Sequence, residues 1–179
     1  MIFSIKLCLM HNGRINGKKN IEFNPGLNVV VGPNGSGKSS LLKAVYHCPD
    51  CLRENDGAME CHYFNSEIMN PHRSEDNFKG PTGSIIKIRA MFSSHGETMR
   101  DVLRFIPLKK NGCLLLDEPE SGHDLKWIIK IRKGLDALAA ADFQIIVATH
   151  HPIFWKNANV IELKRGYVEK SLNKFKKNL

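Results

Sequence analysis

A glycine-rich stretch near residue 35 combines the residue types that bind phosphate. The segment VVVGPNGSGKSSLL (29–42) has the spacing G-x-x-x-x-G-K-S. Glycines let backbone N–H groups crowd around phosphate oxygens, and a helix that starts here points its positive end at the anion. A chance glycine-rich turn is the alternative, but an apolar strand before the loop and a helix after it are what the motif requires. We predict that nucleotide phosphates contact Gly32, Pro33, Asn34, Gly35, Ser36, Gly37, Lys38, Ser39 and Ser40.

Two residues of this loop have separate chemical roles. Lys38 can reach the β- and γ-phosphates of a nucleoside triphosphate, and the Ser39 hydroxyl can bind Mg²⁺. A second magnesium ligand is expected from CLLLDEPESGHD (113–124), where Asp117 ends an apolar run. Glu118, one residue later, can polarise an attacking water. Two solvated acids are the alternative, which the preceding apolar run and the phosphate loop disfavour.

A histidine follows another apolar run. The segment VATHHP (147–152) puts His150 at the carboxyl end of a strand, the edge where ligands of open α/β sheets bind. There it can donate a hydrogen bond to the γ-phosphate, and we interpret His151 as a surface residue. A nucleoside triphosphate with Mg²⁺ is the ligand that these residues predict, with Glu118, His150 and Lys38 as the catalytic set.

The elements that must position these residues alternate between strand and helix. Apolar runs predict buried strands, helical periodicity predicts the segments between them, and the fold class is α/β with a mainly parallel central sheet. Antiparallel strands are expected at the N-terminus, and residues 159–171 suggest a terminal hairpin. We predict one domain over 1–179, with a core of 1–48 and 85–171, an irregular insert at 49–84 and a basic tail at 172–179.

A second small-polar loop, SSHGE (93–97), precedes a predicted helix. Ser94 and Glu97 have the spacing of a capping box, and Gly96 permits close approach of a ligand. The hydroxyl and the backbone N–H groups would form a second anion site. An ordinary capped helix is the alternative.

The order of these motifs resembles the ABC-type ATPases, and within them the small stand-alone ATPases related to SMC proteins more than transporter subunits. The resemblance covers roughly residues 25–45 and 90–155 and implies a P-loop fold with a reduced helical lobe. It also implies that two copies pair head to tail around ATP, each closing the partner's site with a signature loop. That loop would comprise Ser94, His95, Gly96 and Glu97.

Other positions in the chain follow or depart from this resemblance. Asp124 matches the acidic residue of the D-loop, which lines the dimer seam. No glutamine is found where the family has its phosphate sensor, so Asn65 or Glu67 would replace it. Phe23 or His11 are candidates for stacking on the base.

The cysteines allow a metal site. The chain holds five, and it carries no recognisable export signal, which favours reduced thiols in the cytoplasm over disulfides. Cys48, Cys51, Cys61 and His62, or His47 in place of His62, could bind zinc. Idle or buried thiols are the competing interpretation, because His62 and Cys61 are adjacent and would face opposite sides of a strand.

The formal net charge is +8, and basic residues gather at Lys126, Lys130, Arg132 and Lys133 and in the tail. A nucleic-acid surface and a solvated helix face are both consistent with this pattern. No apolar run is long enough to span a bilayer. We expect a cytoplasmic, ATP-dependent homodimer that works with a second protein in a DNA-linked or defence-type system. A transporter's energy subunit and a nucleotide-gated binding module with little turnover are the alternatives.

Overall fold

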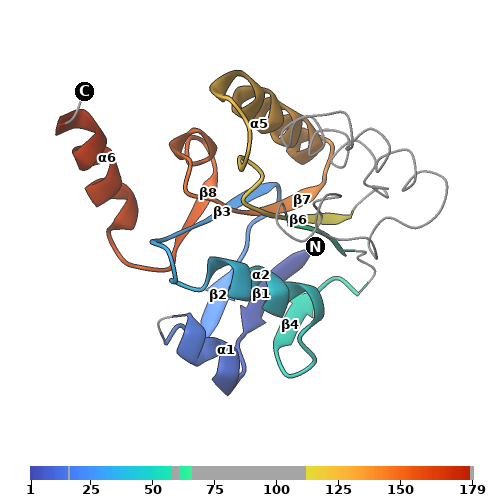
Figure 1. Ribbon diagram of the computed structural model, residues 1–179. Helices are drawn as coiled ribbons and strands as arrows, with labels where there is room; N and C mark the ends of the chain where they lie inside the picture. The colour runs from blue at the N-terminus through green and yellow to red at the C-terminus, as the bar shows by residue number, and fades with distance from the viewer. Residues whose placement is uncertain (16, 58–60, 66–111, 178–179) are drawn as a thin grey trace, which may run out of the picture.

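The computed structural model describes residues 1–15, 17–57, 61–65 and 112–177, and it is built around a five-stranded parallel sheet (Figure 1). The strand order is β5-β6-β7-β3-β8, and all four pairings are parallel. The strands are β3 (Leu27–Val31), β5 (Cys61–Asn65), β6 (Cys113–Asp117), β7 (Gln144–Ala148) and β8 (Asn159–Glu162). The predicted α/β class with a mainly parallel sheet is confirmed.

A second, antiparallel sheet lies beneath the first in Figure 1 and has the order β2-β1-β4. Its strands are β1 (Ile2–Lys6), β2 (Asn20–Glu22) and β4 (Leu52–Asn55), and a short helix α1 (Leu9–Arg14) links the first two. The predicted N-terminal antiparallel strands are therefore present. Helix α2 (Lys38–His47) runs between the two sheets.

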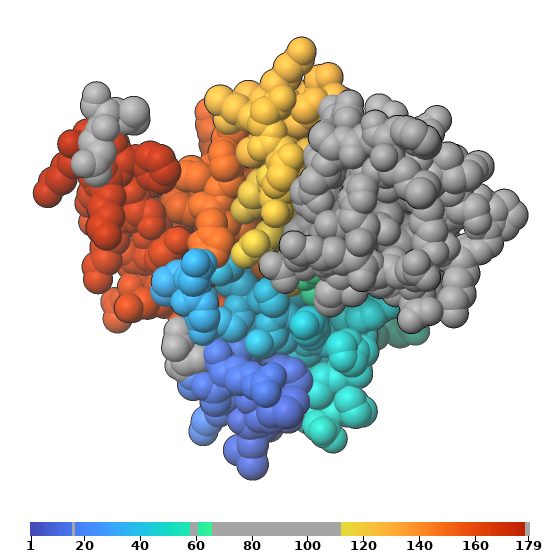
Figure 2. Space-filling view, viewed as in Figure 1, coloured from blue at the N-terminus to red at the C-terminus, as the bar shows by residue number. Residues whose placement is uncertain are grey.

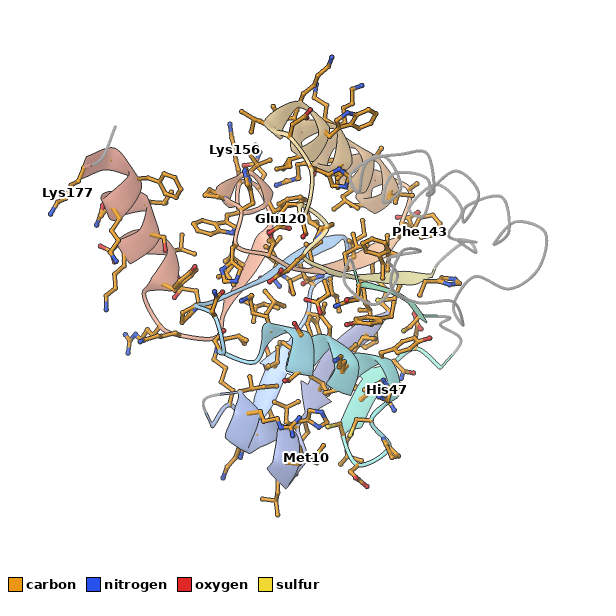
Figure 3. The ribbon with its side chains drawn as sticks, viewed as in Figure 1. Met10, His47, Glu120, Phe143, Lys156 and Lys177 are labelled. Atoms are coloured by element: carbon orange, nitrogen blue, oxygen red, sulfur yellow. The ribbon has the colours of Figure 1, made fainter. Side chains whose placement is uncertain are left out.

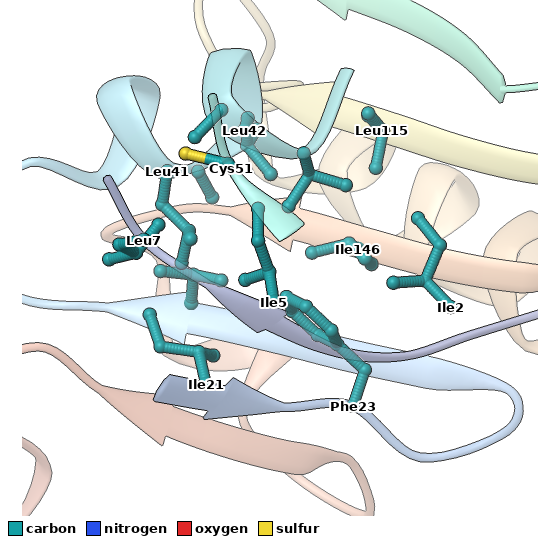
Figure 4. Close-up of a cluster of buried hydrophobic side chains, with 14 of the residues drawn as sticks. Ile2, Ile5, Leu7, Ile21, Phe23, Leu41, Leu42, Cys51, Leu115 and Ile146 are labelled. Carbon is teal, nitrogen blue, oxygen red and sulfur yellow. The ribbon is translucent and has the colours of Figure 1, made fainter. Parts of the chain in front are cut away.

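The three central strands, β3, β6 and β7, are buried along their whole length and are largely apolar on both faces, as expected for a parallel sheet covered on both sides. One face, with Val30, Leu115 and Ile146, packs on α2 and on the antiparallel sheet; Figure 4 shows this cluster. The neighbouring residues in each strand point the opposite way and pack under α5 (Leu125–Ala140) and the 3-10 turn η1 (Pro152–Phe154). Alternation along the strands thus builds two apolar layers around the sheet.

Arg132, one of the residues of the predicted basic surface, is not on the surface. Its side chain is buried and donates hydrogen bonds to the carbonyl oxygens of Ile153, Phe154 and Lys156 at 2.7–2.9 Å, and to Asp136 at 3.0 Å. A guanidinium can satisfy several carbonyls at once because its donors point in fixed, diverging directions. Arg132 therefore holds η1 against α5 and offers no charge to a nucleic acid.

The segments that connect the sheets differ from the sequence predictions. Strands β4 and β5 lie inside residues 49–84, where we predicted an irregular insert. The expected terminal hairpin is wrong: β8 is followed by helix α6 (Tyr167–Lys177), which also takes up most of the predicted basic tail. Glu162 caps this helix: its carboxylate accepts hydrogen bonds from the N–H of Gly166, the residue before the helix, at 2.6 Å and from that of Val168 in the first turn at 2.8 Å.

Helix α6 projects from one side of the molecule, in red in Figure 2. Its lysines lie on the outside, and Figure 3 shows Lys177 far from the centre. Within the described part of the chain, no helix has the length and apolar character needed to cross a membrane.

Candidate functional site

The phosphate loop, residues 32–39, joins β3 to α2 and has an unusually constrained backbone. Gly37 has φ +92°, and a Cβ there would lie 2.5 Å from the carbonyl oxygen of Arg14. A Cβ on Gly32 would lie 2.5 Å from the Ser36 hydroxyl oxygen. At Gly37 the positive φ and the backbone contact leave room for glycine alone, so the end of α1 packs directly on the loop.

Ser36 provides an independent sign of a ligand. Its hydroxyl oxygen is buried, and no described residue forms a hydrogen bond with it. Burying a hydroxyl without a partner costs free energy, and a bound water or anion at the loop would satisfy it. This hydroxyl therefore fits the predicted nucleotide.

Lys38 and His150 meet at the centre of the site. The Lys38 Nζ lies 2.6 Å from the His150 Nε2 and 3.3 Å from the Gly32 carbonyl oxygen. Since the ammonium can only donate, the His150 Nε2 accepts, and its proton sits on Nδ1, 3.3 Å from the Tyr167 hydroxyl. Burial and the charge of Lys38 lower the pKa of His150 below its ordinary 6.5, partly opposed by Glu120.

We expect His150 to be neutral at pH 7, with a protonation midpoint below 6.5 in an NMR titration. The pKa of His150 is lower in the folded protein than in the unfolded chain. At a pH above the unfolded pKa the imidazole is neutral in both states and does not affect stability. As the pH falls below that pKa, the unfolded chain takes up the proton more readily, so the free energy of unfolding decreases. Lys38→Met removes the neighbouring charge and should raise the midpoint. Lys43→Met, an exposed lysine on α2, should leave it unchanged. A wild-type midpoint at or above 6.5 would contradict this assignment.

Ser39 and Asp117 form the predicted magnesium pair. The Ser39 hydroxyl donates to Asp117 Oδ1 at 3.0 Å. The other carboxylate oxygen, Oδ2, accepts from Asn65 at 2.8 Å and from the Tyr63 hydroxyl at 3.1 Å. Burial, and next the charge of Asp117, raise the pKa of Tyr63, so its hydroxyl remains a donor. Asp117 is thus held rigidly, with one oxygen directed at Ser39.

Asn65 occupies a position that the parallel register explains. It pairs with Asp117 across β5 and β6, at the same edge of the sheet. Asn65 is one of the two residues predicted to replace the family's phosphate-sensing glutamine, and its side chain donates a hydrogen bond to Asp117 of the predicted magnesium pair. The other, Glu67, lies outside the described residues.

Glu118 and Glu120 take different positions after β6. Glu118 has φ +51°, uncommon for a residue with a side chain, and its carboxylate is 41% exposed and 3.8 Å from the His150 Nε2. Glu120 points inward, as Figure 3 shows, and accepts from the Thr149 hydroxyl at 2.5 Å and the His150 N–H at 3.0 Å. Glu118 is therefore available to a ligand, whereas Glu120 ties β7 to the turn.

An open cavity of about 820 Å³ is bordered by Lys38, Ser39, Glu118 and His150. Burial lowers the pKa of Lys38, partly opposed by the carboxylates of Glu118, Asp117 and Glu120. The side of the cavity facing α1 is formed by Gly13 and Arg14, which the sequence analysis did not single out. The complete lining is Gly13, Arg14, Asn34, Gly35, Gly37, Lys38, Ser39, Ser40, Glu118 and His150.

Several predicted residues lie elsewhere or in the part of the chain that is not described. The signature residues Ser94, His95, Gly96 and Glu97, and the region of the helical lobe, fall in 66–111, outside the described residues. Asp124 caps α5 by accepting from the Trp127 N–H at 2.9 Å. Phe23 and His11, the candidates for base stacking, are 4% and 7% exposed. Neither can stack on a nucleotide in solvent, so that prediction is wrong.

The proposed zinc set is also wrong in half of its members. Cys48 and Cys51 do lie together, but their neighbours are Cys8 and His11. Cys61 is paired in register with Cys113 on β6 instead, and His62 and His47 are not part of the cluster. Spacing along the chain favours partners close in sequence, whereas the fold brings Cys8 and His11 to Cys48 and Cys51 from 40 residues away.

Tyr63, Glu120 and Tyr167 were missed, although two of them carry a signal. Tyr63 is two residues before Asn65 in the same strand and so shares its face. Glu120 belongs to the acidic segment after β6. Tyr167 has no such signal, because a helix start 17 residues after His150 brings it there.

The sequence matches to known proteins cover the segment that contains the phosphate loop. The AAA domain family AAA_23 matches residues 8–48. The DNA replication and repair protein RecF of Psychromonas ingrahamii is 49% identical over 43 residues, which are 24% of this chain and 12% of RecF. The Rad50 ATPase of Nanoarchaeum equitans, named for DNA double-strand break repair, is 33% identical over 42 residues (24% of this chain, 5% of Rad50). The chromosome partition protein Smc of Synechocystis is 44% identical over 48 residues (27% of this chain, 4% of Smc).

Solved structures extend the likeness to the fold. An inward-facing metal-chelate type ABC transporter superposes with a TM-score of 0.56 at 20% identity, over 82% of this chain and 72% of that one. A dimeric ATP-binding cassette in a post-hydrolysis state with ADP and Pi gives 0.54 at 19% identity, over 83% of this chain and 86% of that one. The matches to ATPases support the prediction of ATP hydrolysis. The chain has the P-loop fold of the ABC-type ATPases, and its phosphate-loop segment resembles the SMC-like proteins RecF, Rad50 and Smc.

Proposed function

We propose that the chain binds Mg-ATP in the cavity beside the phosphate loop and hydrolyses it as a head-to-tail homodimer. The observation that carries the proposal is the convergence of Lys38, Ser39, Glu118 and His150 from three separate segments on one cavity, with Asp117 hydrogen-bonded to Ser39. The buried Ser36 hydroxyl without a partner among the described residues supports a bound anion.

The residues present fit a magnesium ion. Ser39 and Asp117 offer oxygen donors, the ligands that Mg²⁺ prefers, and they are already 3.0 Å apart. When bound, the ion would neutralise charge on the phosphates. Tyr63 and Asn65 would keep Asp117 oriented.

Lys38 changes partners in this proposal. In the structure its ammonium donates to His150 and to loop carbonyls, and phosphate oxygens would compete for the same protons. As Lys38 turns to the phosphates, the His150 Nε2 loses its donor. The tautomer with the proton on Nε2 can then donate to the γ-phosphate, with Nδ1 accepting from the Tyr167 hydroxyl.

Glu118 is positioned as the general base. Its carboxylate lines the cavity and would take the proton from the attacking water, while Lys38 stabilises charge on the phosphates. The second copy would close the cavity with residues 93–97. Asp124, at the start of α5, would lie at the seam.

The relatives suggest a setting. RecF, Rad50 and Smc are named for DNA repair, replication and chromosome partition, so we propose a cytoplasmic, DNA-linked role with a second protein. Lysines 126, 130 and 133 on α5 and those of α6 would contribute the charge. Because the chain spans 12% or less of these relatives, the proposal rests on the loop and the site rather than on their whole activities.

The test is ATP turnover and assembly state measured together. We expect Mg-ATP to convert the wild type from monomer to dimer in light scattering, Mg-ADP to fail to do so, and DNA to stimulate phosphate release. Lys38→Met should lose ATP binding, with Lys43→Met as the matched control. ATP-dependent dimers without turnover, with or without DNA, would favour a nucleotide-gated binding module. No ATP binding at all would overturn the proposal.

A further inference from the structure

Three cysteines and a histidine converge at the end of the molecule that carries α1. Cys8 is the N-cap of α1, and His11 lies in its first turn. Cys48 is the C-cap of α2, and Cys51 directly precedes β4. The spacings C-x-x-H and C-x-x-C thus come from two chain corners, β1 to α1 and α2 to β4, that the fold brings together.

The donor atoms are spaced for one metal ion. The four atoms all lie within 4.8 Å of one another. The His11 Nδ1 is 3.2 Å from the Cys8 Sγ and 3.7 Å from the Cys51 Sγ. A tetrahedral zinc ion, with Zn–S of about 2.3 Å and Zn–N of about 2.0–2.1 Å, has ligand-to-ligand distances of about 3.5–3.8 Å. The cluster therefore needs a contraction of about 1 Å at most.

The surroundings fit a metal better than idle thiols. His11, Cys48 and Cys51 are 7%, 5% and 3% exposed, whereas Cys8 is partly exposed and leaves a way in. The Cys8 N–H donates to the Cys51 Sγ at 3.3 Å, and a backbone hydrogen bond of this kind stabilises a thiolate that binds a metal. Thiolate and imidazole donors favour zinc over magnesium or calcium.

We propose that Cys8, His11, Cys48 and Cys51 bind one structural zinc ion. Four protein donors fill a tetrahedral shell and leave no open position, so the ion would hold the fold together and catalyse nothing. It would join two chain corners 40 residues apart and link both to the end of α2 opposite the phosphate loop. The site is separate from the ATP cavity, so its test is independent of hydrolysis.

The first test uses the full chain expressed with zinc and purified without chelator. We expect one zinc per chain by mass spectrometry of metals. X-ray absorption at the zinc edge should give a first shell of three sulfurs and one nitrogen. A chain without metal, or a shell dominated by oxygen or nitrogen, would overturn the proposal. So would a disulfide among Cys8, Cys48 and Cys51, detected by peptide mapping of unreduced protein.

The second test uses matched cysteine variants. Cys48→Ser should lower zinc affinity at least tenfold, and Cys61→Ser, which lies outside the cluster, should keep one zinc per chain. EDTA should lower the Tm of the wild type and of Cys61→Ser alike. Equal zinc content in the two variants would refute the assignment, and if Cys48→Ser does not fold, the absorption spectrum of the wild type still decides.

Discussion

Glu118→Gln should lower the rate of ATP hydrolysis by about 10²–10⁴-fold while leaving ATP binding intact. The carboxylate lines the cavity and is not engaged as Glu120 is, so it is free to take a proton from water. Glutamine keeps the shape of the side chain and the strained backbone at φ +51° but cannot act as a base. Because binding persists and turnover stops, the ATP-bound dimer should accumulate, which size-exclusion chromatography with Mg-ATP would show.

A distant acid provides the control for that substitution. Glu22→Gln changes an exposed carboxylate on β2, in the other sheet, and should leave turnover and assembly unchanged. If Glu118→Gln hydrolyses ATP at the wild-type rate, Glu118 is not the base. Loss of ATP binding in the variant would instead mean that the carboxylate shapes the cavity.

Gly37→Ala should destabilise the fold by about 2–4 kcal/mol and weaken ATP binding at least tenfold. The left-handed backbone at φ +92° is costly for alanine, and the new methyl would lie 2.5 Å from the Arg14 carbonyl oxygen and 2.9 Å from the Ile15 side chain. Backbone atoms cannot swing away, so α1 or the phosphate loop must move. Urea denaturation without nucleotide measures the stability.

Gly35→Ala separates the two causes. Gly35 has φ +75° in the same loop, but a Cβ there would meet nothing within 4 Å. Its substitution should therefore cost only the backbone strain, about 1–2 kcal/mol. Equal losses for the two variants would show that the contact between α1 and the loop contributes nothing.

The parts of the fold that could be predicted from the sequence are those governed by local pattern. β3, β6 and β7 are the continuous apolar runs that precede the phosphate loop, Asp117 and His150, and each is a strand as predicted. Helix α6 was missed because its cap comes from Glu162, four residues before Gly166, through a contact that residue types do not reveal. The Cys/His cluster was half missed because sheet pairing, not spacing, chooses its members.

The same distinction applies to the site. The roles expected for Lys38, Ser39 and Asp117 follow from motifs whose chemistry demands those residue types at those positions. Tyr63 and Tyr167 act through the motif residues, on Asp117 and on His150. Residues that support a motif residue are chosen by how separate strands and helices pack together. A sequence pattern does not reveal that packing, so these residues could not be predicted.

The position of β3 between β7 and β8 also affects how the protein is made. While the chain emerges from the ribosome, its phosphate loop leaves early, but both flanking strands, residues 144–148 and 159–162, are synthesised much later. Lys38 meets a partner 112 positions downstream. A nascent chain therefore has no complete cavity for a nucleotide until β7 has docked beside β3 and brought His150 to Lys38.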